Sequence, residues 1–227
     1  MNKFSRFEKI VGKDSVELLS KKSVLILGVG GVGGYVCEAL ARSGIGTLIL
    51  VDYDIVDESN INRQIIALDS TIGMKKVDVL KERVKDINSS CEVICIDSFI
   101  DNDNIKELFN YKFDYFIDCC DTVSTKKAVI SKCLELDIKF ISCMGTGNKL
   151  DPSKLEIVDI RKTVNDPLAK IIRKYVNDMK TNKKVMVLSS LELPIKIQDR
   201  TPGSSSFVPG SAGLLIASYV VRDFLKK

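Results

Sequence analysis

The sequence contains no histidine, and none of its seven cysteines lies in a C-x-x-C pair. Histidine is the usual general base of enzymes and the partner of Ser or Cys nucleophiles, so its absence excludes those catalytic schemes. Cysteine pairs are common ligands of structural zinc, so we expect no zinc site. What remains is chemistry that depends on the positioning of substrates, on cationic side chains and on a hard metal ion.

The chain also lacks any apolar run that we judge long enough to cross a bilayer, and we see no signal peptide. An odd number of cysteines without paired spacing is typical of the reduced thiols of a cytoplasm. We therefore predict a cytoplasmic protein without a membrane partner. The net charge of +4 is mild: it permits an RNA partner but does not indicate one by itself.

One stretch near the N-terminus organises the rest of the sequence. An apolar run at 24–27 is typical of a strand covered on both faces, and a glycine-rich turn follows it. Gly28, Gly30 and Gly33 fit the G-x-G-x-x-G pattern, in which glycine lets backbone N–H groups approach an anion. Asp52 ends the next apolar run and lies 52 − 33 = 19 residues beyond Gly33. An acid that binds a ribose hydroxyl is expected at roughly 20 residues, so we predict a nucleotide-binding strand–helix–strand unit.

A polar loop follows Asp52 and carries Asn60, Arg63 and Gln64, and Lys76 opens the next predicted helix. Cations at the mouth of a nucleotide crevice suit a triphosphate and the charge that develops during phosphoryl or nucleotidyl transfer. An NAD site needs no such second set of cations, so we favour ATP over a dinucleotide. Taken one at a time, Arg63 and Lys76 are equally well explained as solvated surface charges.

Four short motifs in the first half carry a resemblance to a known family. They are Gly-x-Gly-Gly-x-Gly at 28–33, Ala-Arg-Ser-Gly-Ile-Gly at 41–46, Asp-x-Asp-x-Val at 52–56 and Ser-Asn-x-Asn-Arg-Gln at 59–64. Together they resemble the ThiF/MoeB/HesA adenylyltransferase superfamily of ubiquitin-activating-like proteins. Within that superfamily, the chain is similar to the tRNA threonylcarbamoyladenosine dehydratases, on motifs at 144–153, 166–170 and 206–209.

The resemblance implies an ATP site with Mg²⁺ as the metal. The residues implied to bind the nucleotide are Gly28, Gly30, Gly31, Gly33, Asp52, Asp54, Asn60, Arg63, Gln64 and Lys76. The residues implied to act in catalysis are Arg63, Lys76, Asp121 as the Mg²⁺ ligand, and Arg6 as an arginine finger. In the superfamily this arginine reaches the phosphates of a partner subunit, so the resemblance also implies a homodimer.

Two of these assignments have a simpler alternative. Asp121 follows a predicted strand at 114–118, on the edge where parallel sheets bind ligands, but it also suits the N-cap of a helix that begins near Thr122. Asp118 lies where it could orient a metal ligand without binding the metal itself. Arg6 is equally well explained as a solvated arginine in a frayed terminus.

We predict a single domain over residues 1–227 with an α/β fold: a doubly wound, mostly parallel Rossmann-like sheet with an antiparallel C-terminal extension. Beyond the first unit, helices are predicted at 76–88, 124–136, 167–179 and 211–224, and strands at 92–97, 114–118, 139–144, 155–160 and 184–188. Residues 1–20 form an N-terminal segment with a short helix capped by Asp14. Residues 191–210 are predicted to be either a mobile loop that crosses the active site or a floppy surface loop.

The function implied by the resemblance is the ATP-dependent dehydration of threonylcarbamoyladenosine in tRNA. A carboxylate, already ionised at neutral pH, attacks the α-phosphate, and the carbamoyl group then displaces AMP to close a ring. This function implies that tRNA carrying threonylcarbamoyladenosine is a partner. It is also compatible with a partner from a sulfurtransferase system. One alternative is activation of the C-terminal glycine of a small ubiquitin-like sulfur carrier, with Cys143 as the acceptor thiol. The other is an NAD-dependent or non-catalytic nucleotide-binding protein.

Overall fold

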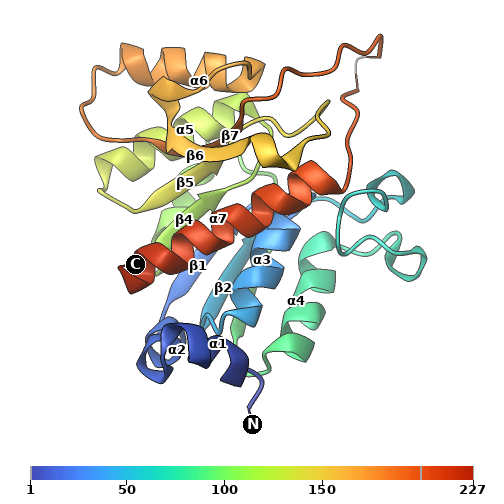
Figure 1. The fold of residues 1–227 in the computed structure, drawn as a ribbon, viewed down its shortest axis with the longest axis vertical. Helices are drawn as coiled ribbons and strands as arrows, with labels where there is room; N and C mark the ends of the chain where they lie inside the picture. The colour runs from blue at the N-terminus through green and yellow to red at the C-terminus, as the bar shows by residue number, and fades with distance from the viewer. Residues whose placement is uncertain (1, 200, 227) are drawn as a thin grey trace.

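The fold is built on one sheet with helices on both faces, as Figure 1 shows for a computed structural model that describes residues 2–199 and 201–226. Within these residues, seven strands follow the order β3-β2-β1-β4-β5-β7-β6. They are β1 (Ser23–Leu27), β2 (Thr47–Val51), β3 (Glu92–Ile96), β4 (Tyr115–Asp118), β5 (Phe140–Cys143), β6 (Leu155–Asp159) and β7 (Met186–Ser190). Neighbouring strands are parallel except for β6 and β7. The predicted doubly wound sheet with an antiparallel extension is confirmed.

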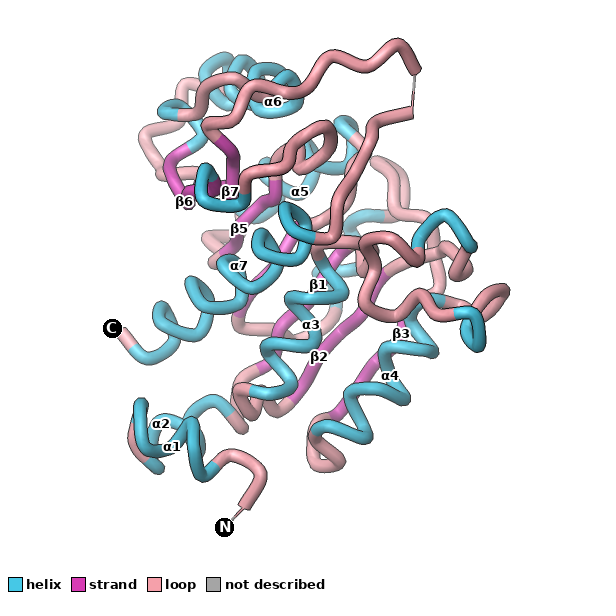
Figure 2. The backbone as a smooth tube through the Cα atoms, turned by 45° about the vertical axis from the view of Figure 1, so that its right-hand side comes forward, coloured by secondary structure: helices cyan, strands magenta, loops and turns pink. Residues whose placement is uncertain are grey.

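The helices divide between the two faces of this sheet (Figures 1 and 2). The first face carries α3 (Gly33–Arg42), α4 (Lys76–Ile87) and α7 (Phe207–Leu225), and the second carries α5 (Val123–Glu135) and α6 (Pro167–Asp178). In β1, Val24 and Ile26 pack into the core of the first face, whereas Leu25 and Leu27 pack into that of the second. Because both faces of β1 are covered, its sequence is apolar throughout instead of alternating.

The N-terminal segment differs from the prediction. It forms two short helices, α1 (Ser5–Val11) and α2 (Lys13–Leu19), and the N-cap of α2 is Gly12. The prediction that Asp14 caps a helix was therefore wrong. Asp14 lies instead in the first turn of α2, where a carboxylate interacts favourably with the partial positive charge of the helix N-terminus.

The C-terminal extension is part of the main sheet. The predicted strand at 184–188 begins later, at Met186, and β7 pairs with β5 in parallel as well as with β6 in antiparallel. The predicted cap of the helix at 167–179 is confirmed: the side chain of Asp166 accepts a hydrogen bond from the backbone N–H of Ala169 at 2.9 Å, at the start of α6.

The last helix, α7, begins at Phe207 rather than at the predicted Ser211. With 19 residues and a mean hydropathy of 1.2, it meets the length and composition criteria for a membrane span, so the expectation that the chain has no such run was wrong. The fold accounts for this composition, because α7 packs against α3 and 56% of the apolar window is buried inside the protein. An apolar core helix passes the same criteria as a membrane span.

Candidate active site

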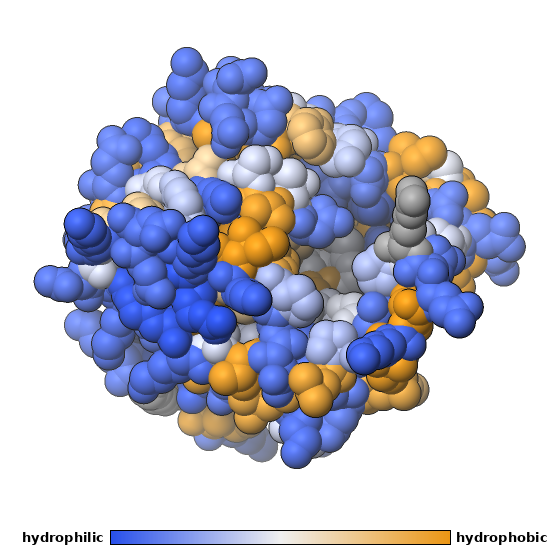
Figure 3. All heavy atoms as spheres, turned by 90° about the horizontal axis from the view of Figure 1, so that it is seen from above, coloured by the Kyte–Doolittle hydropathy of each residue, from blue (hydrophilic) through white to orange (hydrophobic). Residues whose placement is uncertain are grey.

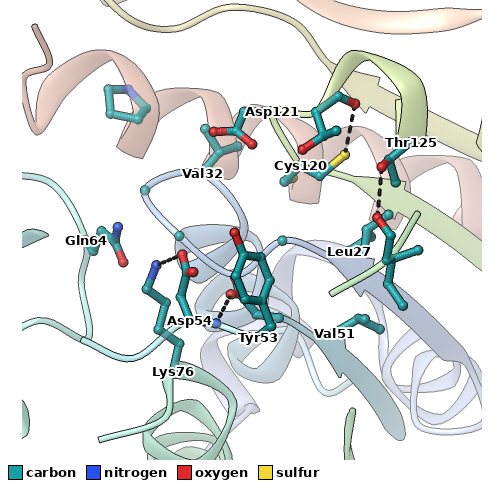
Figure 4. Close-up of a pocket in the computed structure, with 18 of the residues that line it drawn as sticks. Leu27, Val32, Val51, Tyr53, Asp54, Gln64, Lys76, Cys120, Asp121 and Thr125 are labelled. Carbon is teal, nitrogen blue, oxygen red and sulfur yellow. Dashed lines mark hydrogen bonds and ion pairs between the residues drawn. The ribbon is translucent and has the colours of Figure 1, made fainter. Parts of the chain in front are cut away.

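A cavity of about 370 Å³ lies where β1, β2 and β4 end and α3 begins. Small-molecule sites commonly have volumes of about 300–1,000 Å³, and parallel sheets bind ligands at the carboxyl ends of their strands. Most of the predicted site residues line this cavity, and Figure 4 shows several of them. They are Gly28, Gly30, Gly31, Asp52, Asp54, Asn60, Arg63, Gln64, Lys76 and Asp121.

The glycine turn forms one wall of the cavity and has a tight geometry. Gly28 adopts a φ of 82°, in the left-handed region that favours glycine. Gly33 does not line the cavity. A Cβ at Gly33 would lie 1.9 Å from the carbonyl oxygen of Gly28, so its role is to let α3 begin directly against the turn. No side chain caps the N-terminus of α3. The N–H of Gly34 already donates to the carbonyl oxygen of Gly30 at 2.9 Å, so an anion would be bound by other N–H groups of the turn and first helical turn.

Asp52 has a structural role that the ribose assignment did not anticipate. One of its carboxylate oxygens accepts a hydrogen bond from the N–H of Val29 at 2.7 Å, and the other accepts one from the N–H of Asp54 at 2.9 Å. Burial raises the pKa of Asp52, although these two hydrogen bonds act in the opposite direction. Each carboxylate oxygen keeps a further lone pair, so Asp52 can also accept a hydrogen bond from a ribose hydroxyl.

Lys76 and Asp54 form an ion pair at the edge of the cavity (Figure 4). Lys76 Nζ lies 2.7 Å from Asp54 Oδ2, and the lysine side chain is only 6% exposed. The backbone N–H of Lys76 also donates to the carbonyl oxygen of Asp54 at 3.0 Å. Asp54 therefore holds the ammonium group of Lys76 beside the cavity. The alternative that Lys76 is a freely solvated surface charge was wrong.

The polar loop supplies further groups to the cavity. Arg63 Nη1 donates to the carbonyl oxygen of Ser59 at 2.7 Å and to Asn62 Oδ1 at 2.9 Å, so the guanidinium is held by its own loop. Gln64 is buried, and its Oε1 is without a hydrogen-bond partner among the described residues. Buried polar atoms are nearly always paired, so an unpaired one in a cavity wall indicates a ligand contact. Asn60 has a local structural role, because its Oδ1 accepts from the N–H of Asp57 at 3.3 Å.

Asp121 lies across the cavity from Lys76 and Asp54 (Figure 4). It does not cap α5, whose N-cap is Thr122 without a side-chain hydrogen bond, so that alternative was wrong. Its side chain is exposed and has no hydrogen-bond or ion-pair partner within the described part of the chain. The structure thus leaves this carboxylate free to bind a cation.

Other predicted residues lie away from the cavity. Arg6 is exposed on α1, near the edge where β1 begins, whereas the cavity lies at the edge where β1 ends (Figure 1). Cys143 is buried without lining the cavity, and burial raises its pKa to about 12. Cys119 and Cys120 do line the cavity, but burial raises the pKa of both thiols well above the usual range. None of these three thiols is a thiolate near neutral pH.

Some cavity residues escaped the sequence analysis. Tyr53 and Phe99 line the cavity and contact each other edge to face, with ring centroids 4.9 Å apart. They are 55% and 46% exposed, which is unusual for large aromatic side chains. The position of Tyr53 directly after Asp52 could have indicated its role, but Phe99 lies in an irregular stretch after β3 and offers no local signal.

Part of the segment between β7 and α7 lies against the cavity. Ser204 lines the cavity, and its carbonyl oxygen accepts a hydrogen bond from Asn62 Nδ2 at 2.9 Å. Gly203 and Asn148 are joined twice: the N–H of Gly203 donates to Asn148 Oδ1 at 2.6 Å, and the N–H of Asn148 donates to the carbonyl oxygen of Gly203 at 2.8 Å. The segment is thereby tied to the polar loop and to the loop after β5, which contributes Thr146 to the lining.

Comparison with known proteins supports the predicted resemblance over the full chain. The ThiF family profile matches residues 4–199. A tRNA threonylcarbamoyladenosine dehydratase from Bacillus subtilis is 43% identical over 243 residues, which cover 100% of this chain and 96% of that protein. A solved structure of E. coli tRNA N6-threonylcarbamoyladenosine dehydratase, TcdA, in complex with ATP is similar with a TM-score of 0.92 at 31% identity. That match covers 99% of this chain and 94% of the E. coli chain.

A relative with a different name matches less of the sequence. A molybdopterin-synthase adenylyltransferase from Haemophilus influenzae is 32% identical over 134 residues, which cover 59% of this chain and 55% of that protein. The sulfur-carrier alternative is therefore the more distant one, and the buried thiol of Cys143 gives it no acceptor. The chain belongs to the ThiF family and, within it, to the group of the tRNA threonylcarbamoyladenosine dehydratases.

Proposed function

We propose that this protein catalyses the ATP-dependent dehydration of threonylcarbamoyladenosine in tRNA. The observation that carries the proposal is the cavity, which gathers a glycine turn, an acid, two cations and a free carboxylate. These groups match the parts of a nucleoside triphosphate. The similarity to dehydratases over the full chain, one of them solved with ATP, supports both the substrate and the cofactor.

In this proposal each part of ATP meets a different set of residues. The N–H groups of the glycine turn and of the first turn of α3 hold phosphate oxygens, and Asp52 holds a ribose hydroxyl. Arg63 and Lys76 neutralise the charge that moves toward the departing pyrophosphate. To reach the phosphates, Lys76 exchanges its carboxylate partner Asp54 for a phosphate oxygen or shares its three donors between them.

Mg²⁺ is the metal that the site suits. Within the described residues, no group of three or more His, Cys, Asp or Glu side chains could hold a metal by itself. Asp121 is a single hard ligand, and Mg²⁺ in nucleotide sites is usually held by one or two carboxylates together with phosphate oxygens. Bound there, Mg²⁺ would neutralise negative charge on the triphosphate.

The reaction then needs two substitutions. In the first, a carboxylate oxygen of the threonyl group bonds to the α-phosphorus, and the bond from that phosphorus to the bridging oxygen of pyrophosphate breaks. In the second, the carbamoyl group bonds to the activated carbonyl carbon, and the bond from that carbon to the oxygen now carried by AMP breaks. One proton is released on ring closure. The net loss from the modified base is one water, whose oxygen leaves in AMP.

This route suits a site without histidine or thiolate. The attacking carboxylate is ionised at neutral pH and needs no base. The task of the protein is to align two anions and to balance their charge. The protonated thiols of Cys119 and Cys120 are packing groups in this scheme, because a covalent thioester step would require a thiolate.

The partners follow from the same proposal. The face at the top of Figure 1, shown from above in Figure 3, is largely hydrophilic, and Lys170 and Lys174 are exposed there on α6, which suits contact with RNA. We further propose a homodimer in which Arg6 enters the cavity of the second subunit, since it lies away from its own cavity. A cytoplasmic location and contact with a sulfurtransferase system are consistent with the reduced cysteines.

The test is ATP turnover with three acceptors: tRNA that carries threonylcarbamoyladenosine, the same tRNA without the modification, and a small sulfur-carrier protein. We expect AMP and pyrophosphate with the modified tRNA alone, together with a modified base that is lighter by one water. Turnover with the carrier protein and not with the tRNA would refute the proposal. Mixing Arg6→Ala subunits with Asp121→Ala subunits tests the dimer, because activity should reappear in the mixed dimer.

A further inference from the structure

A buried ion pair lies directly behind the wall of the cavity. Lys126 Nζ on α5 is 3.0 Å from Asp118 Oδ2 at the end of β4, and both side chains are 0% exposed. Ser142 Oγ on β5 donates to the same carboxylate oxygen at 2.5 Å and lies 3.3 Å from Lys126 Nζ. Because removing two charges from water is costly, a buried ion pair contributes little net stability compared with apolar side chains of the same size. Its place in the fold points to a functional reason.

The other oxygen of Asp118 connects this pair to the cavity. Asp118 Oδ1 accepts a hydrogen bond from the backbone N–H of Cys120 at 3.1 Å. The preceding N–H, of Cys119, donates to the carbonyl oxygen of Leu27 at 2.8 Å, next to the glycine turn. Two successive backbone groups before Asp121 are therefore held, one by β1 and one by the buried carboxylate.

The turn formed by residues 119–121 is also packed tightly against the glycine turn. A Cβ at Gly28 would lie 2.9 Å from the carbonyl carbon of Cys119 and 2.9 Å from the nitrogen of Cys120. The 119–121 turn thus lies so close to Gly28 that a side chain at that position would collide with it. Its position decides where the free carboxylate of Asp121 stands relative to the phosphates.

We propose that Lys126 is a positioning residue for the metal-bound triphosphate. Through Asp118, it holds the 119–121 turn in the geometry in which Asp121 faces the phosphates. The inference rests on the proposed function, because it takes Asp121 as the Mg²⁺ ligand. Lys126 does not line the cavity and so does not touch the substrate. Without the charge of Lys126, the carboxylate of Asp118 has no counter-ion to hold its orientation, and the N–H of Cys120 loses its fixed acceptor.

The test is Lys126→Met, which removes the charge and keeps most of the side-chain volume. Binding of ATP with Mg²⁺, of ATP with EDTA and of AMP is measured by calorimetry. We expect the affinity for ATP with Mg²⁺ to fall by about 10- to 100-fold, the usual effect of residues that orient a metal ligand. Binding of AMP and of ATP with EDTA should stay within about twofold, because the glycine turn and Asp52 are unchanged.

A matched control is Lys149→Met. Lys149 Nζ lies 3.2 Å from Asp166 Oδ2, with the side chains 1% and 0% exposed, so it also belongs to a buried ion pair. That pair lies at the N-terminus of α6 and does not hold the 119–121 turn. We expect Lys149→Met to lower the melting temperature like Lys126→Met but to leave the Mg²⁺-dependent part of ATP binding unchanged. Equal losses of Mg²⁺-dependent binding in the two variants would overturn the proposal.

Two further variants keep the test decisive if Lys126→Met folds poorly. Ser142→Ala removes one hydrogen bond to Asp118 and leaves the ion pair, and it should weaken Mg²⁺-dependent binding in the same direction by a smaller factor. When Ser142→Ala is combined with Asp121→Ala, Mg²⁺-dependent ATP binding should be no weaker than in Asp121→Ala alone, because both changes act through the carboxylate of Asp121. Additive losses would refute the positioning role. If instead wild-type protein binds ATP with Mg²⁺ but never turns over modified tRNA, the proposed function fails while the role of Lys126 in ATP binding stands.

Discussion

Replacing Gln64 by leucine should change stability and ligand binding in opposite directions. Within the described residues, Gln64 Oε1 and Ser189 Oγ are the buried side-chain polar atoms that have no hydrogen-bond partner. Gln64 is 6% exposed and lines the cavity, so its unpaired oxygen is desolvated without compensation until a ligand arrives. Leucine has a similar volume and no polar group to desolvate.

The expected magnitudes follow from this geometry. An unsatisfied buried polar group costs about 1–3 kcal/mol, so Gln64→Leu should stabilise the ligand-free protein by about 1–2 kcal/mol. For a domain of this size, that corresponds to a rise in melting temperature of about 2–8 °C. Oε1 accepts hydrogen bonds, so its partner on ATP is a neutral donor, a ribose hydroxyl or the adenine amino group. Such a hydrogen bond contributes about 0.5–1.5 kcal/mol, so ATP affinity should fall by about 2- to 13-fold.

The assay pairs calorimetric unfolding without nucleotide with titration of ATP and Mg²⁺. Ser189→Ala is the matched control, because Ser189 lies on β7, is 2% exposed and does not line the cavity. It should stabilise the protein to a similar degree and leave ATP affinity unchanged. A lower melting temperature for Gln64→Leu would mean that the oxygen is satisfied in solution. Unchanged ATP affinity would mean that Gln64 does not contact the nucleotide.

Three further results are expected. Arg63→Ala and Asp121→Ala should each lower AMP formation by about 100-fold or more while the melting temperature of the free protein stays within about 2 °C, because neither side chain is buried. A larger melting shift would make the loss a folding effect. Cys120→Ala and Cys143→Ala should retain most of their turnover, since burial raises the pKa of both thiols, that of Cys143 to about 12. If either cysteine variant keeps its fold but loses turnover, a mechanism through a thioester on that cysteine would be favoured instead. With ¹⁸O in the threonyl carboxylate, one label should appear in AMP, and its recovery in free water or pyrophosphate would contradict the adenylate.

The first half of the site was predictable because its constraints are local. The glycine pattern, the buried strands on either side of it and the acid that ends the second strand all lie within one short stretch. Gly33 shows the physical reason: a side chain there would collide with the carbonyl oxygen of Gly28, five residues before it. Such a constraint is visible in the spacing of the residues alone.

The pairing of charges was not predictable in the same way. Lys76 was predicted to bind phosphate, but its ion pair with Asp54 joins residues that are 22 positions apart. Asn62 and Ser204 are 142 positions apart and meet only because the last segment returns along the cavity. With 34 basic and 30 acidic residues in the chain, spacing cannot say which ones meet. The packing of the sheet and helices decides that.

Local propensity also misled in two places. Asp14 is a good capping residue, yet Gly12 ends one helix and begins the next, so the cap lies two residues earlier. The apolar and small residues after Ser211 predicted a helix, but the helix takes in Phe207 as well, with Pro209 in its first turn, where a missing N–H costs nothing.

Asp52 connects two parts of the proposed nucleotide site. The carboxylate proposed to bind the ribose accepts hydrogen bonds from the N–H of Val29, in the glycine turn proposed to bind phosphate, and from the N–H of Asp54, the partner of Lys76. Changing this side chain would loosen the phosphate end as well as the sugar end. A weakened affinity after substitution at this position therefore cannot be assigned to one lost ribose contact, and sugar and phosphate recognition will not behave as independent contributions.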